Sequence, residues 1–269
     1  MTAPGVQSAS VATGGYPNFP GKHAEEAIFT AADFVDYLRR ARGLDVGDAP
    51  PTVVICYQRS LYQRVLRAEG LEPGARMGVP LPLPSTGGRV GLLGQFGIGA
   101  PAASAALEMA ARGTTAVTSI GTAGSLQRNL FPSDLVRCEA AIRDEGVSHH
   151  YLPPARLATA PAELTAALGA AMTESGLRFR AGTSWTIDTP YRETVAEARH
   201  YQAEGVLCVE MEAAALFAVG EVRGLQMASA FVISDSLADL VWDPRFHGPE
   251  VEAGLFALYQ AAVSALTAG

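Results

Sequence analysis

The sequence contains few cysteines, no long apolar run and no cluster of basic residues. Its three cysteines stand singly, without the CxxC spacing of a zinc site or the density of a disulfide framework, so we expect buried, reduced thiols and no metal. No window approaches the roughly 18 uninterrupted apolar residues of a membrane span, and the first residues lack the basic and apolar parts of a leader. These absences predict a cytoplasmic protein.

The 20 Lys and Arg residues are nearly all arginine and form no stripe, and the acids outnumber them to give a net charge of -7. Binding along a phosphodiester backbone requires a basic surface, so nucleic acid is excluded as a polymeric partner. A hydrophobic content of 48% with 17% charged residues is typical of a compact α/β protein. With 269 residues we predict a flexible N-terminal segment over 1–20 and one large domain over 21–269.

Strands and helices alternate along the chain. Thr30 is placed to cap a helix that Gly43 ends, and short β-branched runs separate further helical segments. Strands are predicted at 51–57, 89–96, 114–121, 134–142, 178–187, 205–211 and 225–234. Helices are predicted at 31–42, 60–70, 100–113, 161–176, 191–205, 212–224 and 248–266. This alternation predicts an α/β domain with a largely parallel sheet covered on both faces.

In sheets of this kind, ligands bind outside the carboxyl ends of the strands, so the segments there are the candidate sites. The segment GQFGIGAPA contains Gly97, Gly99 and Ala102, which match the G-x-G-x-x-A fingerprint of dinucleotide binding. That interpretation needs an acid at the end of the next strand, which instead ends in Ser119 and Gly121. A tight turn, or a turn that opens onto another small ligand, therefore stands beside NAD binding as an alternative.

Three further strand ends carry polar groups. In SIGTAGS, Thr122 and the backbone amides could cradle an anion or a sugar hydroxyl, or the segment could be a tight strand-to-helix turn. In VISDSLAD, Asp235 could take part in chemistry or only cap a turn. In VEMEAA, Glu210 and Glu212 flank Met211 where a strand becomes a helix; stabilisation of the helix start explains one acid but not two.

Taken in order, SIGTAG, VEMEAAA and SDSLAD resemble the nucleoside phosphorylase type I family, which contains purine nucleoside and uridine phosphorylases and related nucleoside hydrolases. The likeness runs from about residue 50 to the C-terminus, and RDEGVSHHYLPP resembles a segment of the uridine phosphorylase branch. The resemblance implies an α/β catalytic domain of three αβα layers, with a central, twisted, mixed but largely parallel sheet. It also implies a homo-oligomer, either a dimer or a hexamer, and no cofactor beyond inorganic phosphate as a co-substrate.

The resemblance assigns roles at the sugar. Glu212 would accept hydrogen bonds from the 2' and 3' hydroxyls of a ribose, since an ionised carboxylate can accept from two adjacent groups. Met211 would pack against the sugar, and Glu210 would help to order the ribose pocket. Thr122 would lie between the ribose and the nucleophile.

At the base, the resemblance implies that Asp235, positioned by Ser234, protonates or hydrogen-bonds N7 of a departing purine. Trp185 falls where the family places an aromatic ring against the base, with Thr186 and Tyr191 nearby. Uridine phosphorylases usually lack this aspartate, and the Gln and Arg with which they read uracil are absent from this chain. A purine is therefore the expected base.

The nucleophile site departs from the pattern of the phosphorylases. Ser119 stands where they carry an arginine, and CYQR replaces their G-D-P-x-R loop. Arg59 and Arg76 could substitute in a modified phosphate site that also includes Gly97, Ser119 and Thr122. The hydrolases of the family also lack these arginines, but they need an acid near the first strand, and CYQR contains none.

The expected function is therefore phosphorolysis of a nucleoside, giving free base and ribose 1-phosphate. Hydrolysis by the same scaffold, a nucleoside-binding protein without catalysis, and an NAD-dependent oxidoreductase are the alternatives. His149 and His150 are adjacent and point apart, so they do not form a chelating pair. Whether His23 or His150 reaches the site is left open, and Trp242 is expected to pack the loop after Asp235.

Overall fold

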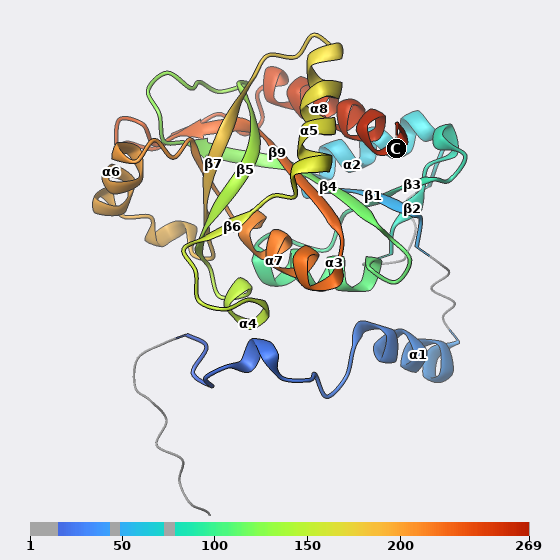
Figure 1. Ribbon diagram of the computed structural model, residues 1–269. Coiled ribbons are helices and arrows are strands. Elements are labelled where there is room, and N and C mark those ends of the chain that lie inside the picture. Colours follow the sequence, from blue (N-terminus) through green and yellow to red (C-terminus); the bar gives the residue numbers. More distant parts are fainter. Residues whose placement is uncertain (1–15, 44–48, 73–78, 269) are drawn as a thin grey trace, which may run out of the picture.

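The computed structural model describes residues 16–43, 49–72 and 79–268 (Figure 1). Most of the segment predicted to be flexible, residues 1–15, lies outside this range. The described chain begins at Tyr16, whose hydroxyl lies 2.8 Å from Nε2 of His150 and ties this segment to the domain. No helix within the described ranges is long and apolar enough to cross a membrane.

The elements follow the predicted alternation. The strands are β1 Thr52–Cys56, β2 Leu81–Pro82, β3 Val90–Leu93, β4 Ala116–Ser125, β5 Leu135–Asp144, β6 Leu157–Thr159, β7 Phe179–Ile187, β8 Cys208–Glu210, β9 Gln226–Ser236 and β10 Asp243–Pro244. The α-helices are α1 Ala31–Arg42, α2 Arg59–Glu69, α3 Ala100–Ala110, α4 Ser148–Tyr151, α5 Ala162–Glu174, α6 Val195–Ala203, α7 Ala213–Arg223 and α8 Pro249–Thr267. Short 3-10 turns lie at Lys22–Ala24, Pro84–Thr86 and Pro190–Arg192.

Local sequence explains where the first helix begins. The Thr30 hydroxyl accepts a hydrogen bond from the Asp33 amide, and the Asp33 carboxylate accepts one from the Thr30 amide. This reciprocal capping box satisfies two amide groups that the helix itself leaves unpaired. The helix ends before Gly43, as predicted.

Strand β4 organises the sheet. It pairs in parallel with β1 on one side and with β9 on the other, and its last residues also pair antiparallel with β8. Strand β5 pairs in parallel with β7 and antiparallel with β9. The sheet is therefore mixed, and its longest pairings, β4 with β9 and β5 with β7, are parallel. Because β1, β4 and β9 run the same way, their carboxyl ends meet at one edge.

Helices cover both faces of the sheet (Figure 1). Helices α2, α5 and α8 lie on one face, and α3 and α7 lie on the other. Each face has its own buried cluster: Val54, Leu168 and Leu258 belong to the first, and Ile55, Leu107 and Phe217 to the second. The predicted fold class, a single α/β domain with a largely parallel sheet between helical layers, is confirmed.

Some local predictions were wrong. SIGTAGS is not a strand-to-helix turn, because β4 continues through it to Ser125 and pairs with both β8 and β9. Strands β2, β6 and β10 and helix α4 were not predicted. Each has four residues or fewer, which is too short to show a period of apolar residues. The three cysteines are free and buried, as expected.

Candidate active site

A cavity of about 580 Å³ lies at the carboxyl ends of β1, β4 and β9 and at the turn from β8 into α7. Its volume is within the range of small-molecule sites. All three strand ends at which polar groups were singled out contribute to its wall. The lining residues are Tyr57, Gln58, Ile98, Thr122, Ala123, Gly124, Pro190, Tyr191, Glu193, Val209, Glu210, Met211, Glu212, Ser234, Asp235, Leu237, Trp242 and Phe246.

Glu210 holds the turn from β8 into α7. Its Oε2 accepts hydrogen bonds of 2.7 Å from the amides of Glu212 and Ala213, and its Oε1 accepts from the hydroxyls of Ser184 and Thr186. Burial raises the pKa of Glu210, and these four donors oppose the rise. Glu210 is therefore the acid that stabilises the helix start, and its engaged oxygens order the pocket rather than reach into it.

Glu212 is the acid that remains for a ligand. Its side chain is buried, and Oε1 accepts a hydrogen bond of 2.5 Å from the amide of Gly99 in the loop before α3. Burial, and next the neighbouring Glu210, raise the pKa of Glu212 to about 8, while the Gly99 amide opposes the rise. The glycine loop thus presents its amide to a carboxylate of the protein, which leaves it unsuited to a pyrophosphate.

Asp235 lies at the end of β9 on another wall of the same cavity. Oδ1 accepts a hydrogen bond of 2.8 Å from the Ser234 hydroxyl, and Oδ2 accepts one of 3.0 Å from the indole nitrogen of Trp242. Burial raises the pKa of Asp235, and both donors oppose the rise. Trp242 packs the loop after Asp235, as predicted, and in addition it holds the carboxylate.

Glu193 is a fourth acid in the cavity wall, and the sequence did not single it out. Burial, and next the charges of Asp235 and Glu197, raise the pKa of Glu193 to about 7. Its sequence signal is limited to its place in the segment that follows β7.

The remaining end of the cavity is polar and uncharged. Tyr57, directly after β1, lies with its hydroxyl 2.8 Å from Oγ of Ser119, and the neighbouring Gln58 donates a hydrogen bond of 3.1 Å to Oγ1 of Thr122. Gly121 makes room for the tyrosine, since a Cβ there would lie 3.0 Å from Cδ2 of Tyr57. Both residues belong to CYQR, the segment that replaces the G-D-P-x-R loop, but neither was singled out from the sequence.

Two of the residues expected at the base lie elsewhere. Trp185 is fully buried, donates a hydrogen bond of 2.9 Å to Asp144 and packs on Tyr201, so it cannot stack on a ligand in this cavity. Thr186 is fully buried and bound to Glu210, and it supports the β8–α7 turn. Tyr191, by contrast, lies at the rim of the cavity and is 99% exposed.

The residues predicted to bind phosphate do not lie together in the described structure. Arg59 begins α2 with an exposed side chain and does not line the cavity. Gly97 is exposed outside it, and Ser119 is buried behind Tyr57. Of that group only Thr122 is in the wall. Arg76 lies outside the described residues.

Neither of the histidines left open lines the cavity. His23 lies in the turn Lys22–Ala24, and His150 bonds to Tyr16. Within the described chain, no three or more His, Cys, Asp or Glu side chains are grouped to hold a metal ion.

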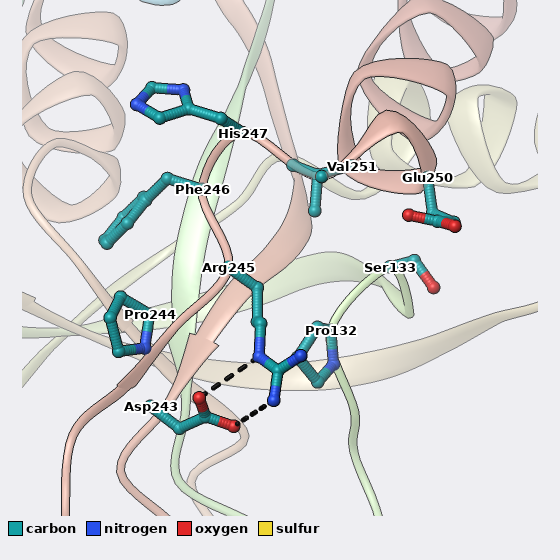
Figure 2. Close-up of a pocket in the computed structure, with 10 residues that line it drawn as sticks. Pro132, Ser133, Asp243, Pro244, Arg245, Phe246, His247, Glu250 and Val251 are labelled. Carbon is teal, nitrogen blue, oxygen red and sulfur yellow. Dashed lines mark hydrogen bonds and ion pairs between the residues drawn. The ribbon is translucent and has the colours of Figure 1, made fainter.

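A second hollow, of about 700 Å³, is lined by the loop between β9 and α8 and by Pro132 and Ser133 (Figure 2). Its one guanidinium, Arg245, is paired with Asp243, and Phe246 lines both this hollow and the cavity. The acids singled out from the sequence, Glu212 and Asp235, line the other cavity.

Comparison with known proteins places this site in a family. Residues 78–264 match the model of the phosphorylase superfamily. The chain belongs to this superfamily. The matched range contains Thr122, Glu212 and Asp235, and the predicted kinship with nucleoside phosphorylases is confirmed. The chain is therefore an enzyme of the nucleoside phosphorylase family, and the dinucleotide interpretation of Gly97 and Gly99 is set aside.

The relatives include phosphorylases of both substrate types. A uridine phosphorylase from Thermococcus kodakarensis is 30% identical over 201 residues, which cover 68% of this chain and 67% of the relative. A DeoD-type purine nucleoside phosphorylase from Bacillus cereus is 31% identical over 119 residues, which cover 44% of this chain and 51% of the relative. The phosphorylase-superfamily match thus fixes the family without choosing between a purine and a pyrimidine.

Solved structures agree on the fold of this superfamily member. A purine nucleoside phosphorylase from Toxoplasma gondii, in complex with immucillin-H, superposes with a TM-score of 0.71 at 20% identity, covering 84% of this chain and 93% of that one. A uridine phosphorylase from Vibrio fischeri superposes with a TM-score of 0.64 at 24% identity, covering 83% and 93%.

Proposed function

We propose that this protein cleaves the N-glycosidic bond of a nucleoside, with a purine as the preferred base. The observation that carries the proposal is the meeting of Glu212 and Asp235 in one cavity, Glu212 at the β8–α7 turn and Asp235 at the end of β9. Cleavage of this bond leaves a ribosyl centre with oxocarbenium character and a base that must accept a proton. We assign Glu212 to the sugar and Asp235 to the base.

Glu212 is suited to the sugar. When ionised, its carboxylate can accept hydrogen bonds from the two adjacent hydroxyls of a ribose, and its negative charge favours the cationic sugar of the transition state. Glu210 is engaged by four donors and fixes the turn on which Glu212 sits. Met211 and Thr122 complete the proposed ribose site.

Asp235 is suited to the base. Burial raises its pKa, which favours the protonated form that a departing purine needs at N7. Ser234 would orient the carboxyl group, and Tyr191 would close the rim over the base. Glu193, whose pKa is raised to about 7, lies close enough to Asp235 for their charges to interact and could share the proton.

Two acceptors can take the ribosyl group. Phosphate would give ribose 1-phosphate, and the printed names of the relatives support this outcome. Water would give free ribose, and the wall of the cavity supports it, because none of its described lining residues is Lys, Arg or His. Neither reaction needs a cofactor. Phosphorolysis takes inorganic phosphate as its co-substrate.

The test is a panel of purine and pyrimidine nucleosides incubated with the protein, with and without inorganic phosphate. Release of free base, faster from purines, is the expected result. Glu212→Gln serves as the matched control, since it keeps the shape of the side chain and removes its charge. If no nucleoside in the panel releases its base, the proposed function is wrong.

We also propose a cytoplasmic homo-oligomer, either a dimer or a hexamer. Exposed apolar side chains between residues 16 and 29 support an assembly, among them Phe19, Ile28 and Phe29, which are 62%, 102% and 69% exposed. Light scattering on the purified chain measures the assembly directly, and a mass of one chain would contradict it.

A further inference from the structure

We propose that the acceptor of the ribosyl group is water, bound at the uncharged end of the cavity by Gln58 and Thr122. This inference rests on the proposed cleavage of a nucleoside and names its second substrate. It is carried by the charge of the cavity wall, by the closure of one end by Tyr57, and by an unpartnered amide oxygen of Gln58.

The charge of the wall disfavours an anion. Four acidic residues line the cavity, Glu193, Glu210, Glu212 and Asp235, and no described lining residue carries a positive charge. Phosphate near neutral pH carries between one and two negative charges. In a site of reduced dielectric it would be repelled by every ionised acid in this wall, whereas a water molecule carries no net charge.

The end of the cavity beyond Thr122 is closed by a neutral ring. The Tyr57 hydroxyl pairs with Ser119 at 2.8 Å, the edge of the ring contacts Phe96, and the ring packs against the backbone at Gly121. Burial raises the pKa of Tyr57 well above its usual value, so the phenol stays uncharged at neutral pH. Tyr57 thus fills the space beside Ser119 without offering a charge to an anion.

Gln58 offers an acceptor where a phosphate needs donors. Its Nε2 donates to Oγ1 of Thr122, and no described protein group donates to its buried Oε1. A buried amide oxygen without a donor is costly, and a water molecule can relieve that cost by donating a hydrogen bond. Hydrogen phosphate could also donate its proton here, but its anionic oxygens need donors, which the amide oxygen of Gln58 cannot supply. The Thr122 oxygen already accepts from Gln58, so its own hydroxyl proton is free to point into the cavity.

The order of contacts along β4 supports the assignment. Ser119, Thr122 and Gly124 follow one another on this strand, and they contact Tyr57, Gln58 and Asp235 respectively. Thr122 and Gly124 are two residues apart and therefore lie on the same side of the strand, roughly 7 Å from each other. The proposed water site and the acid that serves the base are thus separated along the wall.

The reaction balances with water alone. The bond between C1' and the base nitrogen breaks, its electron pair goes to the base, and the base takes a proton from Asp235. The water oxygen forms the new bond to C1' and loses a proton to solvent, from which Asp235 is protonated again. Nucleoside and water give free base and ribose, with no oxidant, reductant or further reactant.

The experiment measures base release and the sugar product with and without inorganic phosphate, for the wild type and three variants. Gln58→Leu keeps the size of the side chain and removes both polar atoms; Gln58→Glu keeps the acceptor; Thr122→Val removes the hydroxyl. We expect ribose as the product, a rate that phosphate does not raise, and a fall in kcat of roughly tenfold or more for Gln58→Leu with KM little changed. Gln58→Glu should keep more activity than Gln58→Leu.

The outcomes separate this inference from the proposed function. Ribose 1-phosphate as the product, or base release that requires phosphate, would support the function and overturn the inference. A folded Gln58→Leu variant with the wild-type kcat would also overturn it. Absence of base release from every nucleoside would instead refute the proposed function itself.

Discussion

The indole nitrogen of Trp242 donates a hydrogen bond of 3.0 Å to Oδ2 of Asp235. The contact joins an exposed loop residue to a buried acid, since Trp242 is 62% exposed and Asp235 is 6% exposed. The Ser234 hydroxyl donates to the other carboxyl oxygen, Oδ1, so both oxygens of Asp235 have a donor. A base that takes a proton from Asp235 must therefore share or displace one of these two donors.

Nucleoside binding should change the emission of Trp242. The chain has only two tryptophans, and Trp185 is fully buried away from the cavity, so Trp185→Phe leaves Trp242 as the single reporter. We expect titration with a purine nucleoside to alter the fluorescence of Trp185→Phe and to leave that of Trp242→Phe unchanged. A response that persists in Trp242→Phe would show that the base does not reach this loop.

Asp235→Asn should slow purine nucleosides more than pyrimidine nucleosides. Asparagine keeps the shape of the side chain but cannot give up a proton, and a positioned general acid contributes roughly 100- to 10,000-fold to a rate. The measurement is kcat/KM for one purine and one pyrimidine nucleoside in wild type and variant. Equal losses for both substrates would contradict proton donation to the purine.

The sequence patterns predicted that Thr122 and Asp235 lie at one edge of the sheet, because parallel strands such as β4 and β9 place their carboxyl ends together. Glu212 follows β8, which pairs antiparallel with β4, so only the fold shows that it reaches the same cavity. Trp185 could not be placed in this way. Both faces of β7 are covered, and successive side chains alternate, so its neighbours Ser184 and Thr186 face Glu210 while Trp185 faces Tyr201. Nothing in the strand sequence says which face meets the cavity.

The uncharged end of the site shows the same limit. Tyr57 and Gln58 follow β1 in CYQR, the segment that replaces the G-D-P-x-R loop, and the sequence assigned a role to neither. Their roles depend on distant partners on β4, since Tyr57 and Ser119 are 62 positions apart and Gln58 and Thr122 are 64 apart. The sequence did show that the usual arginine is replaced by Ser119. Only the pairing of β1 with β4 shows that a tyrosine hydroxyl occupies the space beside that serine.

The kcat/KM of the enzyme should rise with pH through about 8, the value to which burial and Glu210 raise the pKa of Glu212. The ionised form accepts the ribose hydroxyls, and kcat/KM reports the free enzyme. Glu212→Gln should remove this limb of the profile and lower kcat/KM roughly 10- to 100-fold above that pH. Glu193→Gln is the control for the second acid with a raised pKa and should leave the limb in place. If Glu193→Gln shifts this limb and Glu212→Gln does not, the limb belongs to Glu193 and the assignment to Glu212 is wrong.

Stability should fall as pH rises toward 8. The pKa of Glu212 is raised from 4.5 to about 8 in the folded protein, so between these values the folded state binds more protons than the unfolded state. The contribution of this group is fully present below its unfolded pKa and is lost as pH rises through the folded one. Glu193, with a pKa raised from 4.5 to about 7, acts in the same direction. Thermal melting of wild type and Glu212→Gln across this range should show a steeper decline in wild type, and parallel curves would contradict the raised pKa.

Gly121→Ala should loosen the closure of the cavity by Tyr57. The added methyl group would lie 3.0 Å from Cδ2 of the tyrosine ring, so the ring, which is also held by its hydrogen bond with Ser119, must move by a few tenths of an ångström. We expect a loss of about 1 to 3 kcal/mol in the free energy of unfolding, as for other overpacked sites. Tyr57→Ala in the same chain removes the clash, so the double variant should lose less than the sum of the two single variants. Chemical denaturation of all four proteins measures this coupling, and strictly additive losses would mean that Gly121 and Tyr57 do not constrain each other.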